Sequence, residues 1–190
     1  MFFNGAFEHG ARALSGPHAC CNVTRWVARI VVAATASCIW WHCSAALACQ
    51  VRLSHADETA AFQAAGFSRH GEQWRACDDP GTRSYTPGAI QEVRDLNGDG
   101  VPEAVITEGG TYCYGHTGAA FSVVSKRTDG TWVLVVTSIG IPVFLPERGV
   151  DGWPDIEIGG PGFCFPVLRW NGHEYRVDRY QYAGVPCEPD

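Results

Sequence analysis

The sequence is short of charge and of the motifs that mark common catalytic sites. Only 18% of its 190 residues are Asp, Glu, Lys or Arg, and no cluster of basic residues follows residue 48. This argues against nucleic acid or an anionic membrane surface as a partner. The chain has no Gly-x-Ser-x-Gly elbow and no phosphate-binding glycine loop. Hydrophobic residues make up 46% of the sequence, which is enough for a folded core.

The first part of the chain is typical of a secretory signal peptide. Arg25 and Arg29 precede an apolar run from Ile30 to Trp41, and Ala46-Leu47-Ala48 has the small-x-small pattern of a cleavage site. The run is shorter than the ~20 apolar residues of a membrane-spanning helix. We therefore expect residues 1–48 to be leader and signal peptide, and the protein to be periplasmic or secreted.

Two details of this leader are open. Met1 is the only methionine and lies 24 residues before Arg25, so a start near Val23 is an alternative that gives a leader of ordinary length. Cys49 follows the cleavage site in a loose match to a lipobox, so an outer-membrane lipoprotein is the alternative localisation. Residues 49–190 form a single expected domain with eleven basic and nineteen acidic side chains, a net charge of −8.

A run of alternating oxygen-bearing side chains predicts a calcium site. In the segment Asp95-Leu96-Asn97-Gly98-Asp99-Gly100-Val101-Pro102-Glu103, oxygen donors stand at positions 1, 3, 5 and 9 and a glycine at position 6. Calcium takes about six to eight oxygen ligands, which a tightly curled loop can supply. The expected ligands are Asp95, Asn97, Asp99, the Val101 carbonyl and Glu103. Ile106 stands where an EF-hand has its Glu, so the loop leads into a strand. The simpler alternative is a solvated turn without metal.

A repeat of 52 residues runs through the exported part of the chain. Asp99-Gly100-Val101-Pro102-Glu103-Ala104-Val105-Ile106 is echoed by Asp151-Gly152-Trp153-Pro154-Asp155-Ile156-Glu157-Ile158. Each copy is followed by a hairpin signal, Asp129-Gly130 or Asn171-Gly172, between apolar-rich runs. The second copy has Glu147 and Gly149 in place of Asp95 and Asn97, so we expect it to keep the turn without the ion.

Four cysteines of the exported part predict two disulfides. They are Cys77, Cys113, Cys164 and Cys187, and none is spaced as Cys-x-x-Cys, which argues against a zinc ribbon or a thioredoxin-like site. Three pairings are possible. Cys113 and Cys164 both follow paired glycines in the two copies, so we predict Cys113–Cys164 and Cys77–Cys187. A Cys113 nucleophile with His116 as its base is the alternative.

The acidic loop and the strand after it resemble the β-repeats of FG-GAP/VCBS-type proteins. The match includes Asp95, Asn97, Asp99 and Gly100, with Glu103 in place of the usual last Asp. It covers residues 89–136 well and 149–180 weakly. The segments Gly159–Pro166 and Trp170–Gly172 are also similar to small exported proteobacterial proteins of unassigned function. The resemblance implies a mainly β, antiparallel fold of two blade-like units, too short to close a propeller. The acid-to-glycine pattern of residues 57–66 adds one short N-terminal helix.

These features predict an exported, calcium-binding structural or recognition module without catalytic activity. Its tryptophans and tyrosines would pack within the sheets or bind a protein or carbohydrate of the cell envelope. The alternative is a glycosidase-like envelope hydrolase with paired carboxylates among Asp151, Asp155 and Glu157. His173-Glu174 begins like a zinc-protease helix, but Val177 stands where the second histidine belongs. A deep pocket with two converging carboxylates would favour the hydrolase.

Overall fold

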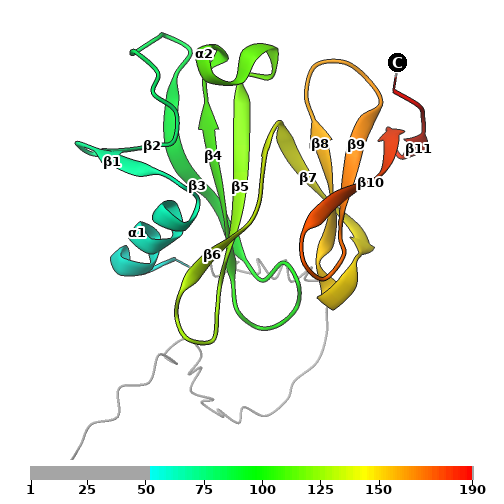
Figure 1. Ribbon diagram of the computed structural model, residues 1–190, viewed down its shortest axis with the longest axis horizontal. Coiled ribbons are helices and arrows are strands. Elements are labelled where there is room, and N and C mark those ends of the chain that lie inside the picture. The colour runs from blue at the N-terminus through cyan, green and yellow to red at the C-terminus, as the bar shows by residue number, and fades with distance from the viewer. Residues whose placement is uncertain (1–51, 190) are drawn as a thin grey trace, which may run out of the picture. The chain divides into compact units, whose positions relative to one another are not determined.

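Two antiparallel sheets and a few short helical elements make up the described part of the chain (Figure 1). The computed structural model describes residues 52–189, so the predictions about the start, the signal peptide and Cys49 lie outside the described residues. The first sheet contains, in order, β1 (Ser68–His70), β2 (Gln73–Arg75), β3 (Thr86–Arg94), β4 (Glu103–Gly109), β5 (Ala119–Lys126) and β6 (Trp132–Ile139). The second contains, in order, β11 (Val185–Pro186), β10 (Tyr175–Tyr182), β9 (Phe165–Trp170), β8 (Pro154–Gly159) and β7 (Ile141–Arg148). The helical elements are α1 (His55–Ala64), α2 (Thr111–Tyr114), η1 (Gly115–Thr117) and η2 (Val150–Gly152).

The prediction of a mainly β, antiparallel fold with a short N-terminal helix is confirmed, and local signals explain much of it. The Ser54 hydroxyl caps α1 by accepting the Asp57 N–H at 3.1 Å. Both predicted Asx-Gly hairpins form, and their glycines have the left-handed φ values that such turns need, 87° at Gly130 and 100° at Gly172. Among residues 52–189 we find no helix with the length and apolar character of a membrane span.

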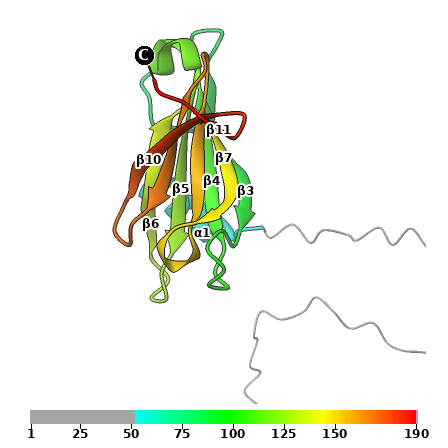
Figure 2. The same cartoon turned by 90° about the vertical axis from the view of Figure 1, so that its right-hand side faces the viewer.

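The layers follow from the alternation of side chains along the strands. On β4, Ala104 and Ile106 pack in one buried cluster with Phe62 of α1. Val105, which points the opposite way, packs in a second cluster with residues of β8. The order is therefore α1, first sheet, second sheet, and the turned view confirms that the two sheets lie face to face (Figure 2).

The two sequence copies present opposite faces to the space between the sheets. Val105 of the first copy points into this space, but its counterpart 52 residues later is Glu157. In the second sheet the inward residues are instead Ile156 and Ile158. Glu157 and Asp155 point to the outer face by strand alternation. The face of the second sheet that carries Ile156 and Ile158 therefore packs on the first sheet, just as the equivalent face of the first sheet packs on α1. We call this arrangement front-to-back stacking.

All four predicted cysteines form disulfides, but the predicted pairing is wrong. The pairs are Cys77–Cys113, with Cα atoms 6.2 Å apart, and Cys164–Cys187, with Cα atoms 5.7 Å apart. Each pair stays with one sheet, because equivalent positions of the two copies belong to different sheets. Two disulfides indicate an oxidising compartment outside the cytoplasm.

Candidate functional site

The acidic loop between β3 and β4 curls around its own oxygen atoms. The Asp95 carboxylate accepts the N–H groups of Gly98 at 2.7 Å and Gly100 at 2.9 Å. Oδ1 of Asn97 accepts the Asp99 N–H at 3.0 Å, and Oδ1 of Asp99 accepts an N–H two residues further on. Gly98 and Gly100 have φ values of 83° and 86°, where a side chain would strain the backbone. The sequence thus brings Asp95, Asn97 and Asp99 into one tight loop.

Glu103 lies beneath this loop and is fully buried at the start of β4. Its two carboxylate oxygens accept the Leu96 N–H at 2.7 Å and the Ser125 hydroxyl at 2.9 Å. Burial, together with the nearby Asp99 and Asp95 charges, raises the pKa of Glu103 above its ordinary value. Glu103 therefore ties the start of the loop, at Leu96, to β4 and to Ser125 of β5.

The donor set fits calcium in its chemistry, since exposed carboxylate and amide oxygens gather around one small loop. In residues 52–189, however, no three His, Cys, Asp or Glu side chains already converge on a common point. Asp95 and Asp99 direct oxygens towards backbone N–H groups of the loop. For Val101, which was predicted to bind through its carbonyl, the contact present is its N–H donated to Asp99 at 2.7 Å.

The second copy packs directly against the acidic loop. Arg148 donates from Nη1 to the Leu96 carbonyl at 2.9 Å. Gly152 approaches so closely that a Cβ there would lie 2.3 Å from the Asn97 carbonyl oxygen. The second copy does form a turn, η2, and its Gly149 has no room for a side chain because a Cβ would lie 2.5 Å from the Trp170 carbonyl oxygen. The acidic loop is thus part of the contact between the two sheets.

The three acids proposed for a hydrolase, Asp151, Asp155 and Glu157, do not form a pair of free carboxylates. Asp155 is fully buried and forms two hydrogen bonds with Arg169, at 2.9 and 2.8 Å, and one with Arg179 at 2.6 Å. Burial alone would raise its pKa, but the two guanidinium groups hold the pKa of Asp155 below its ordinary value. Glu157 accepts the Gln181 amide at 2.6 Å, and Asp151 lies exposed on η2. A carboxylate kept ionised in this way lacks the raised pKa of a general acid.

A second buried carboxylate network, which was not predicted from the sequence, is centred on Glu108. This side chain is 2% exposed and accepts the Tyr85 hydroxyl at 2.6 Å, the Ala76 N–H at 3.1 Å and the Cys77 N–H at 3.2 Å. It also accepts the Tyr114 hydroxyl, and burial with this neighbouring charge raises the tyrosine's pKa. The network fixes the Cys77–Cys113 disulfide to the end of β4. A Glu in an apolar strand was the only signal in the sequence.

Comparison of the chain with protein-family models, with curated proteins and with solved structures gave no match.

Proposed function

We propose that the chain is an exported calcium-binding module of the FG-GAP/VCBS type, built of two blade-like β units, with a structural or recognition role rather than a catalytic one. The observation that supports this most directly is the acidic loop. Asp95, Asn97 and Asp99 are gathered by a backbone that two left-handed glycines allow to curl. The two disulfides support an extracytoplasmic site of action, where calcium is abundant.

The surroundings of the loop indicate what the ion would do. A divalent cation would offset the repulsion between the Asp95, Asp99 and Glu103 charges. Asp95, Asn97 and Asp99 would hold it, with the Val101 carbonyl and Glu103 as the further expected ligands. The loop also contacts Arg148 and Gly152 of the second copy. A loop ordered by calcium would therefore stabilise both the start of β4 and the contact between the two sheets.

Thermal melting with and without calcium tests this function. Binding to the folded state alone adds RT ln(1 + [L]/Kd), so ~1 mM calcium and a Kd of ~10⁻⁴ M contribute about 1.4 kcal/mol. We expect chelation to lower the Tm by a few degrees and the Asp99→Ala variant to lose the response. Asp129→Ala, in the exposed turn between β5 and β6, is the control that keeps it. If the wild-type melting curves with calcium and with chelator superpose, and metal removal is verified, then residues 95–103 form an ordinary turn and not a calcium site.

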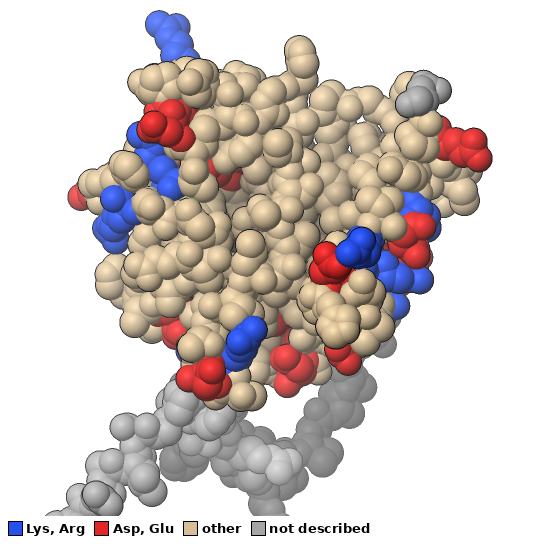
Figure 3. All heavy atoms as spheres, viewed as in Figure 1, with Lys and Arg blue, Asp and Glu red and all other residues tan. Residues whose placement is uncertain are grey.

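The binding partner in this proposal is a protein or carbohydrate of the cell envelope, and no nucleic acid. Few charged side chains appear on the face of Figure 3, and acidic ones gather along its lower end, where the loop between β3 and β4 lies in Figure 1. This distribution agrees with the excess of acidic residues in the sequence. The face in Figure 3 offers no extended basic patch to a phosphate backbone.

A further inference from the structure

One edge of the first sheet is open beside a groove. β3 pairs with β4 along one side, but on its other side it meets β2 only at the pair Trp74 and Gly88. From Ala89 to Arg94, no other strand of residues 52–189 pairs with that side. Such an edge presents N–H and C=O groups that can receive an additional strand.

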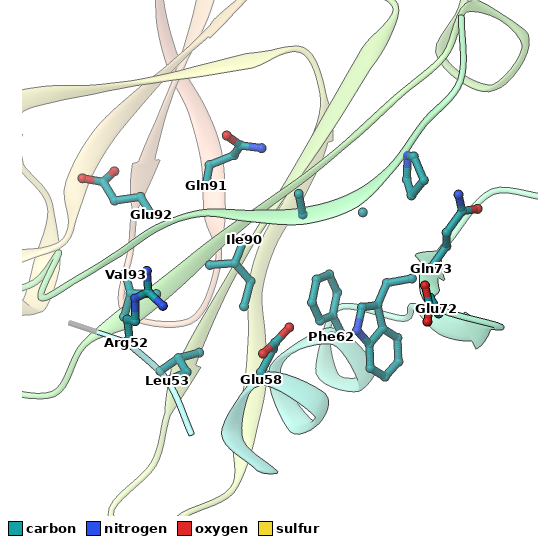
Figure 4. A pocket seen from close by; sticks show the side chains of 14 residues that line it. Arg52, Leu53, Glu58, Phe62, Glu72, Gln73, Ile90, Gln91, Glu92 and Val93 are labelled. Carbon is teal, nitrogen blue, oxygen red and sulfur yellow. The ribbon is translucent and has the colours of Figure 1, made fainter. Parts of the chain in front are cut away.

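A cavity of about 790 Å³ lies along this edge, between β3, β2 and α1. Its lining includes the apolar side chains of Leu53, Phe62, Trp74, Ile90 and Val93. In Figure 4, Ile90 from β3 and Phe62 from α1 point towards each other across the groove. Phe62 and Trp74 are buried, whereas Leu53, Ile90 and Val93 are partly exposed. A chain added along β3 would therefore place side chains of one of its faces next to these three residues.

The groove is also lined by more acidic than basic side chains. Glu58 of α1 and Glu72 of the β1–β2 turn both line it, and neither forms an ion pair within the described chain. Glu92 is already paired with Arg94, at 2.7 Å. Arg52 is the one cation among the lining residues. Basic side chains of a ligand would meet two free carboxylates here.

We propose that this groove binds a basic, extended segment of a partner protein, which adds as a strand along the open edge of β3. Main-chain hydrogen bonds would supply affinity, and the alternating side chains would supply specificity. A second copy of this chain fits less well. β3 has two register irregularities, between Thr86 and Ala89 and between Ile90 and Glu92. Irregularities of this kind hinder edge-to-edge pairing of two folded sheets, whereas a flexible segment can follow them.

The proposal specifies the recognition role of the proposed function, but it uses none of the predicted calcium ligands. Its test is therefore run both in 1 mM calcium and in chelator. The calcium proposal is judged by melting temperature and the groove by peptide binding. Peptide binding without a calcium effect on melting would support the groove alone, and the reverse result would support the calcium loop alone.

The probe is the blocked, fluorescein-labelled peptide Lys-Thr-Val-Thr-Val-Thr-Lys, titrated with the disulfide-bonded exported protein and followed by fluorescence anisotropy. Its odd positions place two valines beside the apolar lining residues and a lysine at each end. We expect saturable binding that is at least tenfold tighter than that of Glu-Thr-Val-Thr-Val-Thr-Glu. Methylation of alternate backbone nitrogens should weaken binding at least tenfold, because a strand then loses main-chain donors.

Matched variants locate the site. Glu58→Gln and Glu72→Gln should each weaken binding about two- to fivefold, as expected of partly exposed ion pairs. Glu188→Gln, an exposed acid near the chain end, should leave binding unchanged, and equal melting temperatures show that all three variants are folded. Equal binding of the lysine and glutamate peptides, or of the methylated and unmethylated peptides, would overturn the proposal. So would a protein that forms dimers through this edge and binds no peptide.

Discussion

Asp57, a partly exposed acid of α1, contributes to stability through its contacts with Lys126 and Trp132. Its carboxylate accepts hydrogen bonds from Lys126 at 2.5 Å and from the Trp132 indole at 3.1 Å. These bonds, led by that from Lys126, lower the pKa of Asp57 from 3.8 to about 2. The side chain is 27% exposed, so solvent screens part of the interaction.

The lowered pKa predicts a pH-dependent effect of Asp57→Asn. Because the folded-state pKa lies below the unfolded value, the contribution is complete well above about pH 4 and is lost as the pH falls through about 2. The variant should be less stable than the wild type by about 1 kcal/mol at pH 6, and the difference should vanish as the pH falls below about 2. Urea unfolding at a series of pH values measures this. A difference that stays constant with pH would show that the ionised carboxylate is not its source.

Gly152 tests the contact between the acidic loop and the second copy. Its φ is 77°, and an added Cβ would lie 2.3 Å from the Asn97 carbonyl oxygen. Gly152→Ala should destabilise by about 2–4 kcal/mol, from backbone strain plus displacement of the loop. Gly162 has a φ of 110°, and an added Cβ there would have no atom within 4 Å. The Gly162→Ala variant therefore measures the backbone strain alone. Equal unfolding free energies for the two variants would mean that the contact between Gly152 and the acidic loop does not contribute to the loss of stability.

Each of the two disulfides closes a loop of moderate length, and the residues of each loop belong to the region of one sheet. The half-cystines are 36 residues apart in Cys77–Cys113 and 23 apart in Cys164–Cys187. Replacing either pair by serines should lower the unfolding free energy by about 3–4 kcal/mol, because the unfolded chain regains the loop entropy. Denaturant unfolding of the two double variants measures this. A Cys113–Cys164 bond found by peptide mapping of the non-reduced wild-type protein would contradict this pairing.

Elements set by local chemistry were predictable, and contacts set by stacking were not. The acid-to-glycine pattern of residues 57–66 predicted α1, which begins two residues earlier, at His55, after a cap at Ser54 that was not predicted. The turns at Gly130 and Gly172 fix two hairpins within a few residues of sequence. The predicted disulfide pairing was wrong because it assumed that cysteines at equivalent positions of the two copies lie close together. The two copies belong to separate sheets. The contacts of Glu103 with Leu96 and Ser125 also depend on how strands lie together. The sequence located the acidic loop but not the groove, whose edge exists because β2 is short.

For the whole molecule, processing gives the clearest expectation. The exported protein should begin at or near Cys49, because the small-x-small pattern of Ala46-Leu47-Ala48 precedes it. Intact mass of the purified protein checks the first residue. An added diacylglyceryl mass would establish the lipoprotein alternative. A full-length cytoplasmic species as the sole product would contradict export.

The front-to-back stacking of the copies gives the molecule two unlike ends. At one end, α1 covers the face of the first sheet that carries Ala104 and Ile106. At the other end, the face of the second sheet carries the Asp155 ion pairs with Arg169 and Arg179. A further duplicated unit appended there would have to lay an apolar face over these charges, at a large desolvation cost. The Asp155 cluster with Arg169 and Arg179 therefore disfavours the stacking of another sheet on this face.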